Sequence, residues 1–214
     1  MRFLRVLLVC VMALSWGGCS SLRGTQAIPD RQSNLRDAAE LYEHEDRPVV
    51  AERLIRQTLD AYARSDDELG LADSYRAYAY FLRSQSVESK RQYFREYGFL
   101  DPTVSFETRY ERSIDYLDKA REIYQRYGRY DALTNINLNI GFTYEVLGNA
   151  EAACRAFDRS LENNRDSQDH NAKVKLGLPK GFASYEEFLA PHRQRVGCDT
   201  LHKHRGKQRR VMSA

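Results

Sequence analysis

Apolar and small residues recur at intervals of three and four in several segments of the chain, which is the period of a helix with one buried face. Residues 137–161 show it most clearly. One face of a first helix carries Ile140, Gly141, Tyr144 and Leu147, and one face of a second carries Ala153, Phe157, Ser160 and Leu161. Gly148 and Asn149 between them tolerate the left-handed backbone of a helix end. The segment is therefore predicted to be an antiparallel helical hairpin.

The same order of large and small residues returns upstream. A first hairpin is predicted from Leu35, Ala39, Tyr42, Ala51, Ile55 and Thr58. The first helix of a second hairpin follows from Tyr75, Ala79 and Leu82, and its second helix from Ser113, Leu117 and Ala120. Ala39 and Ala79 are 40 positions apart, and so are Ser113 and Ala153. A shared interval indicates three related hairpins.

The middle hairpin is irregular, because Ala79 and Gly141 are 62 positions apart and not 40. The extra 22 residues lie within 84–107 and are called the insertion below. Its first half is predicted to extend the preceding helix or to form a short one, which Gly98 and Asp101-Pro102 end. Its aromatic residues either fold back on the adjacent hairpins or contact a partner: Tyr93, Phe94, Tyr97 and Phe99.

Counted from Thr134 as position one, the last hairpin resembles the tetratricopeptide repeat family, which has small residues at positions eight, twenty and twenty-seven and aromatic ones at eleven and twenty-four. Asn137 and Arg165 depart from that pattern, where the family prefers a large residue and Pro. The resemblance implies an all-α, right-handed solenoid, because one such hairpin cannot bury its faces alone. A helix starting near Ser184, with Phe182, Tyr185, Phe188 and Leu189, is predicted to cap the open end. Pro191 is expected to bend or end this helix.

The N-terminus predicts export, since Arg2 and Arg5 precede an apolar run from Val6 to Trp16 that suits a signal peptide. Gly17-Gly18-Cys19 resembles the bacterial lipoprotein signal, although Trp16 departs from it. The resemblance implies lipidation of Cys19 and, with Ser20 next, an outer-membrane protein facing the periplasm. Cleavage after Ala27 is the alternative and gives a soluble periplasmic protein.

These features predict a signal peptide at 1–18, a tether at 19–31, a repeat domain at 32–165, a cap at 166–198 and a basic tail at 199–214. The hairpins fall at 32–68, 72–128 and 134–165. Of four cysteines, Cys10 leaves with the signal and Cys19 is consumed by lipid or removed. Cys154 and Cys198 remain, and an oxidising compartment favours a disulfide between them that clamps the cap; two buried free thiols are the alternative.

Chemistry-bearing motifs of the common hydrolases, nucleotide-binding enzymes and metalloproteases are not found, so the chain is predicted not to be an enzyme and to need no cofactor. His192, His202 and His204 lie beside Pro or in the basic tail, and no metal site is predicted there. The precursor charge of +3 falls to +1 without the signal. Nucleic-acid binding is not expected, whereas contact of the tail with anionic lipid headgroups is an open alternative to a solvated tail.

The repeat resemblance implies that a partner protein binds along the first helices of the hairpins. The positions that carry over are Arg36, Glu40, Glu43, Asp73, Arg76, Tyr80, Arg83, Asn135, Leu138, Phe142 and Glu145. The clamp that some relatives use for a C-terminal carboxylate is missing, because Leu138 and Phe142 occupy key places. The predicted function is a protein-binding scaffold or adaptor of the cell envelope, and the resemblance implies an assembly factor for pilus, secretion or cell-wall machinery. A peptidoglycan- or carbohydrate-associated protein or enzyme, and a structural periplasmic spacer, are the alternatives.

Overall fold

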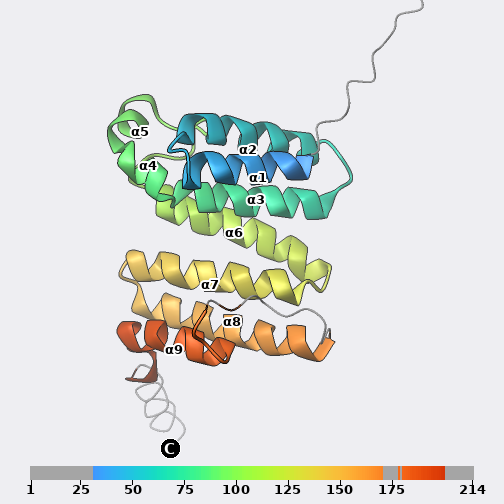
Figure 1. Ribbon diagram of the computed structural model, residues 1–214, viewed down its shortest axis with the longest axis vertical. Coiled ribbons are helices and arrows are strands. Elements are labelled where there is room, and N and C mark those ends of the chain that lie inside the picture. The colour runs from blue at the N-terminus through green and yellow to red at the C-terminus, as the bar shows by residue number, and fades with distance from the viewer. Residues whose placement is uncertain (1–30, 171–177, 179, 201–214) are drawn as a thin grey trace, which may run out of the picture.

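The computed structural model describes residues 31–170, 178 and 180–200, and every regular element of these residues is an α-helix. Figure 1 shows the long helices stacked along one axis, with α1 to α3 near one end and α9 at the other. The helices are α1 (Arg31–Glu43), α2 (Pro48–Ala63), α3 (Glu68–Leu82), α4 (Gln85–Ser89), α5 (Arg91–Tyr97), α6 (Arg109–Arg126), α7 (Tyr130–Val146), α8 (Ala150–His170) and α9 (Tyr185–Val196).

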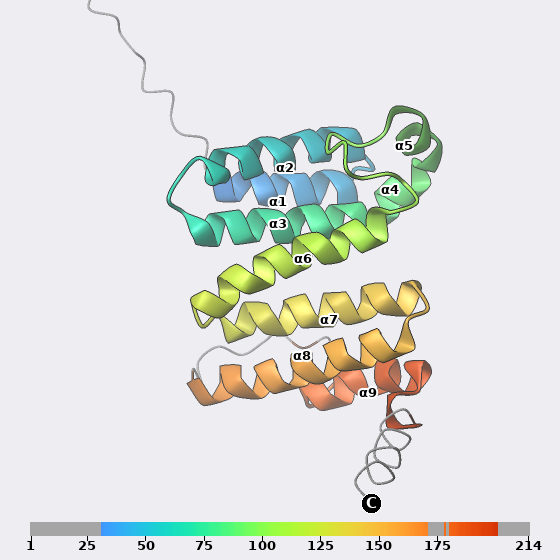
Figure 2. The same cartoon turned by 180° about the vertical axis from the view of Figure 1, so that it is seen from behind.

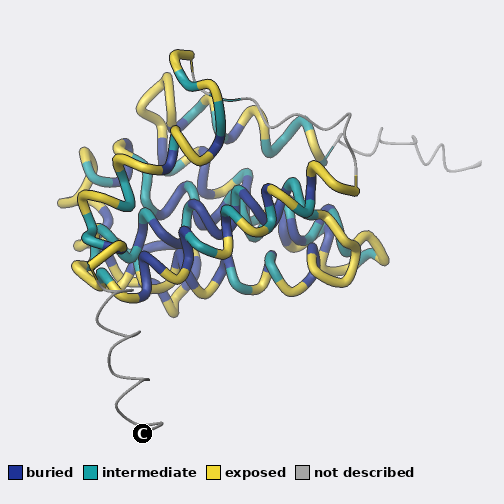
Figure 3. The backbone as a smooth tube through the Cα atoms, turned by 90° about the horizontal axis from the view of Figure 1, so that it is seen from below, coloured by how far each residue is buried: buried dark blue, intermediate teal, exposed yellow. Residues whose placement is uncertain are grey.

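Each long helix packs against the next long helix in the chain, from α1 on α2 through to α8 on α9, and α1 also packs on α3. Buried residues lie along the faces that meet, and exposed residues lie on the outside (Figure 3). The view from behind shows the same order of helices (Figure 2). None of the described helices combines the length and the apolar character that crossing a membrane requires.

The α7–α8 pair forms where the sequence predicts it. The turn between the two helices contains Gly148 at φ +70°, a conformation that side chains with a Cβ rarely adopt. Asn149 then accepts a hydrogen bond from the backbone N–H of Ala152 at 3.1 Å and caps α8. At the crossing, a Cβ added to Gly141 would lie 2.3 Å from a ring carbon of Phe157. Only glycine allows this ring to reach α7.

Asn137 departs from the family's preference for a large residue, and the structure gives the reason. Its side chain is 2% exposed and bonds the Leu133 carbonyl at 3.0 Å and Asn163 Oδ1 at 2.8 Å. The first of these bonds lies within α7 and the second joins α7 to α8, so a polar pair stands at this point of the interface.

The insertion contains two short helices, α4 and α5, while α3 and α6 pack directly on each other. Ser84 caps α4, and α5 ends before Gly98, which has φ +72°. The extended-helix alternative is therefore wrong, and the expected break at Gly98 is confirmed. Phe94 and Phe99 are buried and stack on each other at 4.5 Å, but Tyr97 is 67% exposed. The aromatic residues of the insertion thus divide between the core and the surface.

A buried polar network fastens the second half of the insertion. Glu52, 3% exposed on α2, accepts hydrogen bonds from the Tyr78 hydroxyl at 2.9 Å and from the backbone N–H of Leu100 at 2.8 Å. Asp101, 6% exposed, accepts from the Tyr116 hydroxyl and from the backbone N–H of Thr103 at 3.0 Å. Both carboxylates therefore have partners, as buried charges require.

At the other end of the stack, Cys154 of α8 and Cys198 form a disulfide, with Cα atoms 5.4 Å apart. Ser184 caps α9 by accepting from the backbone N–H of Glu187 at 3.1 Å, so the predicted helix start is confirmed. Pro191 does not end α9, which continues past it to Val196, so this one of the two expectations for Pro191 is wrong. The carbonyl that Pro191 leaves unbonded belongs to Glu187, an exposed residue, where water can solvate it.

Several sequence predictions lie outside the described residues. They concern the signal peptide and Cys10, the lipidated Cys19 and its tether up to residue 30, His202 and His204, and the basic tail from residue 201.

Candidate functional site

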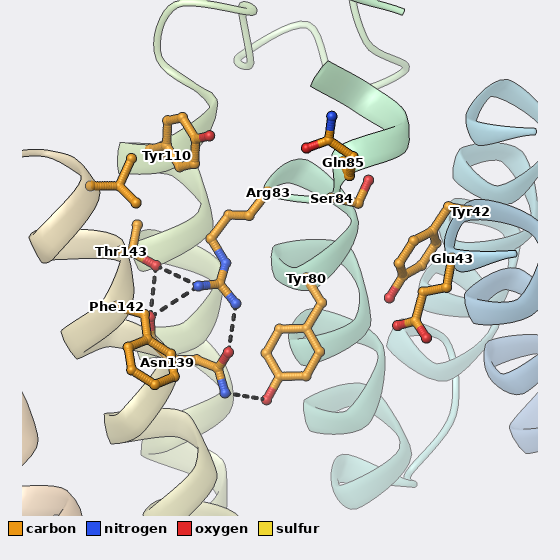
Figure 4. Close-up of a pocket in the computed structure, with 11 residues that line it drawn as sticks. Tyr42, Glu43, Tyr80, Arg83, Ser84, Gln85, Tyr110, Asn139, Phe142 and Thr143 are labelled. Carbon is orange, nitrogen blue, oxygen red and sulfur yellow. Dashed lines mark hydrogen bonds between the residues drawn. The ribbon is translucent and has the colours of Figure 1, made fainter. Parts of the chain in front are cut away.

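Two adjoining pockets open on one side of α1, α3 and α7, with volumes of about 530 and 550 Å³. Tyr42, Glu43, Tyr80 and Asn139 line both pockets, which therefore form one continuous depression, called the groove below. Figure 4 shows how α1, α3 and α7 each direct side chains into the first pocket. Tyr110 at the start of α6 and Val146 at the end of α7 complete that pocket.

The structure brings together most of the partner-binding positions suggested by the repeat resemblance. Eight of the eleven line the groove: Arg36, Glu43, Asp73, Arg76, Tyr80, Arg83, Asn135 and Phe142.

Three of the positions lie elsewhere. Glu40 is 61% exposed and pairs with His44 at 3.9 Å. Leu138 is 8% exposed and packs in the core that α8 and α9 share. Glu145 forms an ion pair with Arg195 of α9. The last two face the cap, which covers this side of α7 and so removes them from the groove.

Asn139 is the most important groove residue that the resemblance did not supply. Its Nδ2 donates to the Tyr80 hydroxyl at 3.0 Å, and its Oδ1 accepts from Arg83 Nη2 at 2.6 Å. Arg83 Nη1 also donates to Thr143 Oγ1 at 2.9 Å. Asn135, Asn139 and Thr143 are spaced four apart, so a polar stripe on one face of α7 was a signal that could have found them. Tyr110 had no comparable signal, because the insertion separates it from α3.

The second pocket contains a charged pair supported by a tyrosine. Arg76 and Asp73 form an ion pair at 2.8 Å, and the Tyr124 hydroxyl donates to Asp73 Oδ1 at 2.6 Å. Although burial favours the neutral guanidine, Tyr124 and Asp73 raise the pKa of Arg76. This arginine is therefore a charged group with its counter-ion in place.

Tyr42 and Tyr80 of the groove are neutral donors and acceptors at neutral pH. Burial, followed by the charge of Glu43, raises the pKa of Tyr42, and burial raises the pKa of Tyr80. With the amides of Asn135 and Asn139, they present hydrogen-bonding groups beside the apolar surface of Phe142. Such a mixture suits recognition of a ligand by shape and hydrogen bonds.

A smaller apolar depression lies where α2 begins, lined in part by Pro48, Val49, Val50 and Tyr93. Tyr93 is 39% exposed and its ring lies 5.0 Å from that of Tyr97. These two tyrosines are the aromatic residues of the insertion that remain at the surface.

Within the part of the chain that the structure describes, no three His, Cys, Asp or Glu residues are placed to hold an ion. His192 instead packs against Phe142, with ring centroids 4.7 Å apart, and joins α9 to a wall of the groove.

Comparison of the chain with protein-family models, with curated proteins and with solved structures gave no match.

Proposed function

We propose that this protein is a non-enzymatic scaffold or adaptor of the bacterial cell envelope, which binds a segment of a partner protein in the groove. The observation that carries the proposal is the groove itself, which crosses α1, α3 and α7 and is lined by aromatic, amide and charged side chains. Tyr and Arg are the residues most often found at the energetic centre of protein interfaces.

The finer architecture that goes with this function is a right-handed solenoid of three tetratricopeptide-like hairpins, closed by a cap. Its support is local. Gly141 and Phe157 meet as the family pattern requires, and Ala51 and Ile55 are fully buried in α2 at the equivalent small and large positions. The packing of each long helix on the next is what a stack of hairpins needs.

The location we propose is the outer membrane, with a lipid on Cys19 and the helices in the periplasm. The Cys154–Cys198 disulfide supports export, because such bonds persist in oxidising compartments. Labelling cells with radioactive palmitate tests the anchor: label on the wild-type chain and none on Cys19→Ala is the expected result. An unlabelled wild-type chain would contradict the lipid anchor and favour the soluble periplasmic protein.

Partner binding is tested by crosslinking in the envelope, followed by purification and identification of the crosslinked species. Asn135→Arg places a long charged side chain in the groove and loses only a weak bond to the Asp131 carbonyl at 3.4 Å. We expect one stoichiometric partner protein with the wild type and its loss with Asn135→Arg. Arg155→Glu is the matched control, because Arg155 is exposed on α8.

Two outcomes contradict the groove. A partner that Asn135→Arg retains and Arg155→Glu loses would move the interface to α8. Peptidoglycan fragments in place of a protein would favour the carbohydrate-associated function.

A further inference from the structure

Arg83 is a cation of the groove that forms no ion pair with any of the described residues. It follows the last residue of α3, is half-buried, and is held by three acceptors on α7. Nη1 donates to the Asn139 carbonyl at 3.1 Å and to Thr143 Oγ1 at 2.9 Å, while Nη2 donates to Asn139 Oδ1 at 2.6 Å. These bonds fix the plane of the guanidinium beside the first pocket (Figure 4).

All three acceptors are neutral, so they satisfy hydrogen bonds without cancelling the charge. None of the ion pairs among the described residues includes Arg83, and its Nε is buried without a hydrogen-bond partner in that part of the chain. Burial lowers the pKa of Arg83, and the groups that oppose the shift are the hydroxyls of Tyr80, Tyr110 and Tyr42. Arg76 in the neighbouring pocket differs, because Asp73 neutralises it.

The carboxylate that lines the same pocket is on the opposite wall. Glu43 is exposed beside Tyr42, and Figure 4 shows its oxygens across the pocket from the guanidinium. A fixed, partly desolvated cation without a partner attracts an anion more strongly than an exposed one does.

Apolar surface adjoins this cation. Val146 is 63% exposed and lines the same pocket as Phe142. The Tyr80 ring lies 5.5 Å from the Arg83 guanidinium carbon. The groove also continues from Arg83 in the other direction, toward Asp73 and Asn135 in the second pocket. A chain bound here can therefore extend past Arg83 on both sides.

We infer that the partner segment, on the proposed function above, carries a side-chain carboxylate that binds at Arg83 and an apolar residue next to it that contacts Phe142 and Val146. Charge complementarity selects this occupant, because a glutamate or aspartate supplies the missing counter-ion. Because the groove extends on both sides of Arg83, we expect the carboxylate to come from a side chain within the segment and not from its C-terminus.

The test measures binding of fluorescent heptapeptides with blocked ends to the purified full chain. Each peptide has Glu at its central position, Leu or Val at one adjacent position, and varied residues at the other positions. Each peptide is paired with its Gln counterpart, and a third set has a central Gln and a free C-terminus. Wild-type protein should bind the best Glu peptides about tenfold more tightly than their Gln counterparts, as expected for one charge-assisted bond.

Variants assign the preference to Arg83. Arg83→Met should abolish the difference between Glu and Gln peptides, and Arg83→Lys, which keeps the charge, should retain part of it. Arg155→Met on α8 is the matched control and should leave the difference unchanged. Thermal melts accompany each variant. Because neither Lys nor Met can reproduce all three bonds of the guanidinium fork, retention of the preference by Lys alone, at a melting temperature similar to that of Met, distinguishes charge recognition from loss of folding.

Three results overturn the inference. Equal binding of Glu and Gln peptides, or a preference for the free C-terminus, would refute it while leaving the groove as the binding site. A Glu preference that Arg83→Met retains would place the cation elsewhere. Absence of binding by every peptide, together with a partner that Asn135→Arg retains in the envelope, would refute both the inference and the proposed function.

Discussion

The insertion and the α9 cap both cover the helix stack with a segment added to it, yet they are held by different means. The insertion places Phe94 and Phe99 in the main core; the backbone N–H of Leu100 donates to Glu52 of α2, and Asp101 accepts from the Tyr116 hydroxyl of α6. The cap buries only Tyr185 and Leu189 of α9, and a disulfide joins it to α8. The insertion is thus held by buried apolar side chains and buried hydrogen bonds, whereas the cap buries fewer large side chains and has a covalent bond in addition to its polar contacts.

Removing an aromatic ring from the core beneath the insertion should produce the largest effect. Phe81 is fully buried and its ring meets those of Tyr42, Tyr78, Phe94 and Phe99 within 6.3 Å. Phe81→Ala should lower the free energy of unfolding by about 3–5 kcal/mol in urea titrations. Tyr97→Ala, at the exposed position, should change it by less than about 0.5 kcal/mol. Similar losses from both variants would mean that the insertion is not anchored at Phe81.

Breaking the disulfide should rank second and should act on the cap alone. The bond joins residues 44 positions apart, and loop-closure entropy predicts that it stabilises the folded state by about 4 kcal/mol. Removal of a native disulfide from a small secreted domain typically lowers the free energy of unfolding by about 2–5 kcal/mol. Cys154→Ala/Cys198→Ala should therefore lower the melting temperature. Hydrogen exchange should rise in α9 and stay unchanged in α4 and α5. A midpoint that reduction leaves unchanged would contradict the clamp.

Filling the contact between α7 and α8 should have a moderate effect. The Cβ of Gly141→Ala would lie 2.3 Å from Phe157 Cε1, which forces a shift worth about 1–3 kcal/mol. The double variant Gly141→Ala/Phe157→Leu should lose less stability than the sum of the two single changes, because the smaller side chain relieves the clash. Strict additivity in a double-mutant cycle would show that the two residues do not press on each other.

The pH dependence of stability should be the smallest effect and should have opposite signs in the two regions. Burial raises the pKa of Glu52, so its contribution is fully present below the unfolded pKa and is lost as pH rises through the raised value. Burial, followed by the charge of Arg195, lowers the pKa of His192 in the folded chain. Stability is therefore lost as the pH falls from the pKa of His192 in the unfolded chain to its lower pKa in the folded chain.

Two variants separate these contributions. The free energy of unfolding of Glu52→Gln, compared with that of the wild type at the same pH, should increase as the pH rises from 4 to 8. The free energy of unfolding of His192→Phe, compared with that of the wild type at the same pH, should increase as the pH falls from 7 to 5. The comparison fails if either difference stays constant across its pH range.

The hairpin helices could be predicted from the sequence because their information is local. Gly141 and Phe157 lie on either side of the turn at Gly148, so their positions on the two helical faces predict that they meet. Cys154 and Cys198 could be paired because the predicted loss of Cys10 and the predicted lipidation or loss of Cys19 left no other partner. In each case a few residues close in the chain, or a simple count, carried the prediction.

The rest required long-range geometry. No local pattern relates Glu52 to the backbone of Leu100, or Asp101 to Tyr116, because their pairing depends on how the insertion folds over α2 and α6. Leu138 and Glu145 were placed in the groove by analogy, but the position of α9 determines that they face the cap. The partners of Arg83 likewise depend on the contact between α3 and α7.

The groove is tested most directly by a photo-crosslinking amino acid placed at Glu43, at Tyr97 and at Arg155, one at a time, in cells. Glu43 lines the groove, Tyr97 is the most exposed aromatic residue of the insertion, and Arg155 is exposed on α8. Binding in the groove predicts one crosslinked partner from position 43 and none from position 155. A partner captured from position 97 or 155 and not from position 43 would contradict it.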